Sequence, residues 1–207
     1  MNLAVLRDHK VVEERLSGFG TTRNEILEIV LAAVAARNES VRNDPNTAAG
    51  LLSWIYGTRR LREIFLPKGW KLDRDNGLES VVNEDSGIKI VFQNASCAAD
   101  PLHAPRALSR KGPGSARAVD LGQYFLFPTD EPVENNNATI WYLFVYIDGD
   151  DIRAEFSCPR SIENDQFKGF HERIFLLEKG ELDEIQLEDD ENATASDFEV
   201  SVTRRES

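Results

Sequence analysis

The stretch TIWYLFVYIDGDDIRAEFSC, residues 139–158, decides the fold. Its first nine residues are β-branched, aromatic or aliphatic on both faces of an extended chain, which is typical of a central strand. An Asp-Gly pair then provides a tight turn, and residues 152–158 alternate apolar with polar side chains. The stretch therefore predicts an antiparallel hairpin at the centre of a sheet, with one face of its second strand in contact with water.

Before this hairpin, residues 1–66 predict helices. Residues 2–16 form a weak helical pattern, and Thr22-x-x-Glu25 matches a capping box at the start of a second helix. A third helix is expected to start after Pro45 and to end before Pro67. We expect five side chains of this third helix to face the core: Leu51, Trp54, Ile55, Leu61 and Phe65.

The remaining elements are shorter. Residues 80–82 and 88–92 flank a turn at Gly87 and predict a hairpin, and a further strand is expected at 124–127. Residues 167–177 are interpreted as a short helix, and 198–203 as an edge strand.

Helices followed by strands predict an α+β class. We expect about three N-terminal helices packed on one face of a mostly antiparallel sheet of five to six strands. Residues 1–207 are taken as one domain. Its parts are a helical part (1–66), a sheet part (78–177) with a basic loop (101–119), and an acidic tract (178–197) expected to be mobile.

Charge is distributed unevenly along the chain. The formal net charge is −12, but residues 59–117 carry a net +4 and residues 118–207 a net −15. No long apolar run or signal peptide is seen, and two cysteines build no disulfide framework, so a cytoplasmic protein without membrane association is expected.

The basic loop contains the best candidate site, in the segment LSRKGPGSARAV at 108–119. Glycines let backbone amides approach an anion, while arginine, lysine and serine side chains donate to phosphate. The competing interpretation is a solvated loop that balances the acidic C-terminal third. The predicted site residues are Arg106, Arg110, Lys111, Gly112, Gly114, Ser115 and Arg117, joined by Arg59 and Arg60.

Other chemistry has weaker signals. Asp148, Asp150 and Asp151 resemble an Mg²⁺ site but also suit a hairpin turn. The potential zinc ligands Cys97, His103, Cys158 and His171 lack the close pairing of zinc modules, so no metal or cofactor is expected. Trp70, between two lysines, is the one tryptophan considered as a contact residue for a base, although a structural role is favoured.

Two functional hypotheses result. The first is a non-enzymatic binding protein that engages nucleic acid or another phosphate-bearing ligand through the basic loop. The alternative is an acidic interaction module of the inhibitor or immunity type, which occupies a basic site on a partner protein, with residues 178–197 as the docking surface. An enzyme is less favoured; it would be an Mg²⁺-dependent phosphodiesterase or nuclease.

Overall fold

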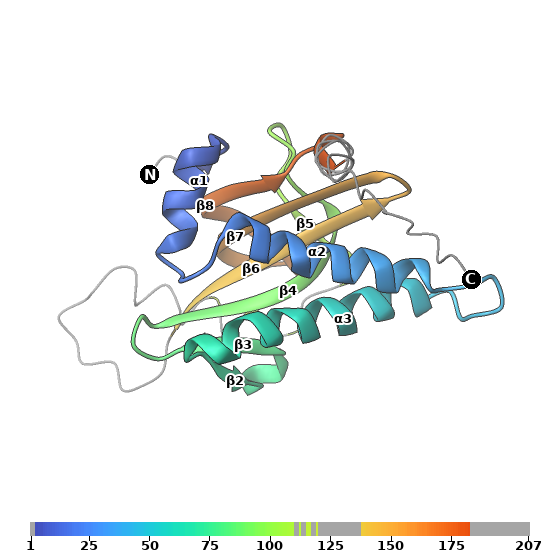
Figure 1. The fold of residues 1–207 in the computed structure, drawn as a ribbon, viewed down its shortest axis with the longest axis horizontal. Helices are drawn as coiled ribbons and strands as arrows, with labels where there is room; N and C mark the ends of the chain where they lie inside the picture. The colour runs from blue at the N-terminus through green and yellow to red at the C-terminus, as the bar shows by residue number, and fades with distance from the viewer. Residues whose placement is uncertain (1–2, 110–111, 113–114, 117–118, 120–137, 183–207) are drawn as a thin grey trace, which may run out of the picture.

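The computed structural model describes residues 3–109, 112, 115, 116, 119 and 138–182 (Figure 1). Its helices are α1 (His9–Ser17), α2 (Arg23–Asn38) and α3 (Ala48–Phe65), with short 3-10 turns at Leu66–Lys68 and Asp75–Gly77. Its strands are β1 (Ala4–Leu6), β2 (Lys71–Asp73), β3 (Ser80–Asn83), β4 (Ile88–Cys97), β5 (Arg106–Ala107), β6 (Thr139–Asp148), β7 (Asp151–Glu163) and β8 (Gln166–Leu177).

The strands form one sheet in the order β1-β8-β7-β6-β4-β3-β2, with β5 paired to β4. The predicted hairpin of β6 and β7 is antiparallel and lies at the centre of this order, and the hairpin of β3 and β4 is also confirmed. Pairing is mostly antiparallel; β4 with β6 and β1 with β8 are parallel. The α+β class is confirmed, although the sheet has eight strands where five to six were expected.

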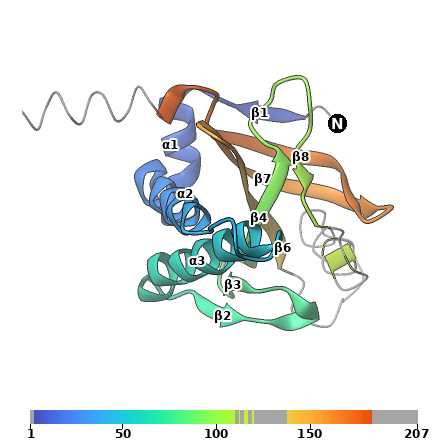
Figure 2. The same ribbon diagram turned by 90° about the vertical axis from the view of Figure 1, so that its right-hand side faces the viewer.

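The three helices pack on one side of the sheet, as Figure 2 shows. The predicted capping box starts α2, because the Thr22 side chain accepts from the Glu25 amide and the Glu25 carboxylate accepts from the Thr22 amide. The apolar faces of the helices bury residues such as Leu16, Ile26 and Leu61 against β6 and β7 in the main hydrophobic core.

Helix α3 is rotated relative to the prediction. Gly57 lies so close to β4 that a Cβ there would be 2.5 Å from the ring of Phe92. This contact turns Leu61 and Phe65 inward, as expected, but leaves Leu51 52% and Trp54 37% exposed, so the inward assignment of those two was wrong. The small residues of the helix mark its contact face, because they allow close approach to the sheet.

The second face of β7 is buried, where a wet face was expected. Glu155 and Ser157 are fully buried, and the Arg173 guanidinium on β8 forms an ion pair with Glu155 at 2.6 Å. The connection after β4 covers this pair: the Ala99 amide donates to Glu155 at 2.6 Å, and Arg173 donates to the Asp100 carbonyl at 3.1 Å. Buried charges are tolerated here because each has a partner.

Four further expectations are either changed by the structure or fall outside the described residues. Residues 167–177 belong to strand β8 and not to a helix, because Asn164 and Asp165, both at positive φ, form a tight turn that returns the chain alongside β7. The N-terminal segment begins with the short edge strand β1 before helix α1, held by parallel pairing to β8. The strands expected at 124–127 and 198–203 fall outside the described residues.

Candidate functional site

A cavity of about 800 Å³, which we call the Trp54 cavity, opens where the N-terminal turn of α3 meets β4 and the basic loop. Its volume lies in the range of about 300–1,000 Å³ that is usual for small-molecule sites. Residues from four segments line it: Arg37, Asn46, Thr47, Ala49, Gly50, Leu51 and Trp54; Gly77, Leu78 and Glu79; Val91, Phe92, Gln93 and Asn94; and Leu108, Ser109, Gly112 and Ser115.

The N-terminus of α3 contributes free donors to this cavity. The N-cap residue Thr47 makes no side-chain capping hydrogen bond. The Ala48 and Leu51 amides donate to backbone carbonyls, but the amides of Ala49 and Gly50 have no acceptor within the described part of the chain. An 18-residue helix carries partial positive charge at this end, so the cavity contains donors suited to an anion.

The basic loop contributes three of its described residues to the cavity. Ser109, Gly112 and Ser115 line it, so part of the predicted site shares this cavity with the N-terminus of α3. A Cβ added at Gly112 would meet nothing within 4 Å among the described residues. Arg110, Lys111, Gly114 and Arg117 lie outside the described residues.

Trp54 supplies an aromatic wall that the sequence reasoning missed. It is 37% exposed, whereas Trp70 and Trp141 are 5% and 4% exposed. Trp70, the tryptophan considered as a contact residue for a base, packs edge-on against Phe65 with ring centroids 4.9 Å apart. The small residues Ser53 and Gly57, which form the contact face of α3, are the signal from which the outward position of Trp54 follows.

Asn94 fixes the helix end against the sheet. Its amide nitrogen donates to the Gly50 carbonyl at 2.7 Å, and its amide oxygen accepts from the Ser53 hydroxyl at 2.8 Å. Both ends of a β4 side chain therefore hold the first turn of α3, which makes the cavity a preformed feature of the fold.

Charged groups at the rim differ in their pairing. Hydrogen bonding from Arg62 holds the pKa of Glu79 below its usual range, and Arg74 adds to the effect. Glu79 is therefore ionised at neutral pH and neutralised by its neighbours. Arg37 has no ion-pair partner among the residues that the structure describes.

The other predicted basic residues do not line this cavity. Arg60 pairs with Glu28 and with Glu63, and the Arg59 guanidinium lies 4.4 Å from the centre of the Tyr56 ring. Arg59 lines a separate cavity along the same helix, with Leu66 and Pro67. Arg106 on β5 is exposed to solvent and is not among the lining residues of the Trp54 cavity.

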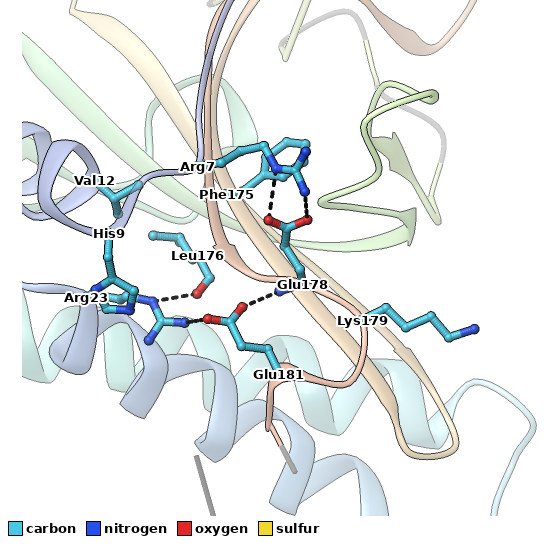
Figure 3. Close-up of a pocket in the computed structure, with 9 residues that line it drawn as sticks. All are labelled: Arg7, His9, Val12, Arg23, Phe175, Leu176, Glu178, Lys179 and Glu181. Atoms are coloured by element: carbon cyan, nitrogen blue, oxygen red, sulfur yellow. Dashed lines mark hydrogen bonds and ion pairs between the residues drawn. The ribbon is translucent and has the colours of Figure 1, made fainter. Parts of the chain in front are cut away.

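A smaller cavity of about 290 Å³, which we call the Arg23 cavity, lies between the N-terminal segment and the residues that follow β8 (Figure 3). Arg7 pairs with Glu178 at 2.6 Å. The nearly buried Arg23 donates to the Leu176 carbonyl at 2.8 Å and pairs with Glu181, which also accepts from the Glu178 amide. Two acids from the start of the predicted mobile tract are thus engaged internally; residues 183–197 of that tract lie outside the described residues.

Residues considered as metal ligands are used otherwise. Asp151 pairs with Arg153 at 2.5 Å, and Asp148 accepts from the Tyr146 hydroxyl. Cys158 packs in the helix-side core, where burial raises the pKa of its thiol to about 12, while His103 is exposed. In the described ranges, no three His, Cys, Asp or Glu side chains are grouped as a metal site requires.

Comparisons with protein-family models, curated proteins and solved structures find no significant match. Among the described helices, none combines the length and apolarity needed to cross a bilayer.

Proposed function

We propose that this protein is a binding protein that holds a phosphate-bearing ligand in the Trp54 cavity. The observation that carries the proposal is the uncapped N-terminus of α3, where Ala49 and Gly50, whose amides have no acceptor within the described residues, line a cavity of ligand size. Anions bind at such helix ends because the amides and the helix dipole favour negative charge.

The loop across the cavity supports the same ligand class. Ser109 and Ser115 line the cavity together with the helix end and carry hydroxyl groups that can donate to phosphate. Arg110 and Lys111 follow Ser109 directly in the sequence, and their placement lies outside the described residues.

A single bound ligand is better supported than an extended nucleic-acid strand. A long strand needs a track of available cations along its backbone. Arg60 is neutralised by Glu28 and Glu63, and Arg62 by Glu79. Among the described arginines of α3, this leaves Arg59 alone without a carboxylate partner, and one cation does not make such a track.

The alternative, an acidic interaction module, has less support. Glu178 and Glu181, at the start of the acidic tract, are paired with Arg7 and Arg23 and are not available to a basic partner. The phosphate-ligand proposal is therefore preferred.

The substitution Gly50→Ala tests the proposal. A Cβ at this position meets nothing within 4 Å, so it enters open cavity space beside the helix-end amides. Replacing a helical glycine by alanine should raise the free energy of unfolding by roughly 0.5–1 kcal/mol, while the affinity for inorganic pyrophosphate should fall at least tenfold.

Calorimetric titration across a salt series measures the affinity, and urea denaturation measures the stability. A stabilised Gly50→Ala protein that binds pyrophosphate as tightly as the parent would contradict the placement of the phosphate. A parent protein that binds no phosphate compound at low salt would overturn the function itself.

A further inference from the structure

We infer that the ligand of the Trp54 cavity is a nucleotide, with its base stacked on the indole of Trp54 and its phosphate at the amides of Ala49 and Gly50. This inference rests on the proposed function and specifies the other end of the ligand. A phosphate group fills only a small part of about 800 Å³, so the rest of the cavity must suit a larger group.

The spacing along α3 supports this class of ligand. Gly50 and Trp54 are four residues apart and lie on the same face of the helix, about one 5.4 Å turn from each other. Side chains of a helix lean toward its N-terminus, so the indole tilts toward the free amides. An aromatic surface and an anion site one helical turn apart match the base and the phosphate of a single nucleotide.

The walls around Trp54 have the character of a base-binding surface. Leu51 and Leu108 are 52% and 58% exposed, and both line the cavity together with Trp54. Large apolar side chains gathered around a concave site and open to solvent indicate a ligand that covers them. Aromatic and aliphatic side chains of this kind hold the flat face of a base.

The polar groups of the cavity predict weak discrimination between bases. Both ends of the Asn94 amide are bound to α3, and the Gln93 amide nitrogen donates to the Asn94 carbonyl at 2.7 Å. Recognition then depends mainly on stacking area, which favours purines over pyrimidines.

The experiment compares ligands that share the phosphate but differ in the ring. Calorimetric titrations use AMP, CMP, ribose 5-phosphate, inorganic pyrophosphate and an eight-residue single-stranded DNA, with the parent, Trp54→Phe and Trp54→Leu. AMP should bind roughly tenfold or more tightly than ribose 5-phosphate, as expected for one base on an aromatic ring. Trp54→Leu should remove this difference, and Trp54→Phe should keep most of it.

Fluorescence provides the matched control, because Trp70 and Trp141 are buried. AMP should quench the tryptophan emission of the parent and leave that of Trp54→Leu unchanged. Equal binding of AMP and ribose 5-phosphate would overturn the nucleotide inference while leaving the phosphate site intact. Absence of pyrophosphate and AMP binding would remove both. DNA binding far tighter than that of AMP would replace the nucleotide with a nucleic-acid strand.

Discussion

The Trp54 cavity and the Arg23 cavity both border an arginine, but they differ in how their polar groups are satisfied. In the Arg23 cavity, Arg23 and Arg7 are matched by Glu181 and Glu178 (Figure 3). In the Trp54 cavity, the helix-end amides have no acceptor and Arg37 has no counter-charge within the described part of the chain. A cavity with matched charges holds segments of the chain together, whereas one with unmatched donors is suited to a ligand.

The largest expected effect lies beneath the Trp54 cavity. Phe92 is 1% exposed and lines the cavity from the core side. Phe92→Ala should lower the free energy of unfolding by about 3–5 kcal/mol, because it removes a fully buried ring and leaves a void. Urea denaturation measures the loss. A loss below about 1 kcal/mol would mean that Phe92 is not packed in the core beneath the cavity.

The substitution Arg23→Met should cause the second-largest loss in the free energy of unfolding. It removes a hydrogen bond to the Leu176 carbonyl and the ion pair with Glu181 in a nearly buried position. We expect a loss of about 1.5–3 kcal/mol, the range for hydrogen bonds of charged groups, with no change in pyrophosphate affinity. Thermal and urea unfolding give the first quantity and calorimetry the second. A variant that keeps its stability but binds pyrophosphate more weakly would contradict this prediction. It would indicate that the ligand binds in the Arg23 cavity and not in the Trp54 cavity.

Two glycines of α3 should respond to alanine with opposite signs. Gly57→Ala places a Cβ 2.5 Å from the Phe92 ring and should destabilise the protein by about 1–3 kcal/mol through overpacking. Gly50→Ala, about two helical turns earlier, is expected to stabilise it. Parallel urea curves of the two variants check the contrast. Destabilisation by both would show that the open space at Gly50 is not present in solution.

The smallest effect on stability is expected at Arg37. This side chain has no ion pair among the described residues, so Arg37→Met should change the free energy of unfolding by less than about 0.5 kcal/mol. Its affinity for pyrophosphate should nevertheless fall several-fold, since a cation is removed from the cavity wall. Unchanged affinity would exclude Arg37 from the site and leave the backbone amides as the main donors.

The parts of the fold that could be predicted follow from local patterns. The apolar run of β6, the Asp-Gly turn and the Thr22 capping box each depend on residues close in sequence. The segment 167–177 was wrongly expected to be a helix, because the spacing of its apolar residues fits both a helix and a strand. It forms a strand because it pairs with β7. The buried face of β7 likewise depends on Arg173, which is distant in sequence.

The site could be predicted in part for the same reason. The composition of the basic loop is local, and Ser109, Gly112 and Ser115 do line the cavity. The outward position of Trp54 depends on the contact of Gly57 with Phe92. The periodicity of the helix alone does not predict this contact, because Phe92 belongs to another element. The pairing of Arg60 with Glu28 also required knowledge of how α2 packs on α3.

The most direct test of the central claim is an NMR titration of the ¹⁵N-labelled protein with AMP. The account predicts shifts of the Ala49 and Gly50 amides, of the Gly112 and Ser115 amides, and of the Trp54 indole N–H, while the Trp70 and Trp141 indoles stay unchanged. Saturating AMP that leaves the Ala49, Gly50 and Trp54 signals in place, or that shifts signals around Arg7 and Arg23 instead, would contradict it.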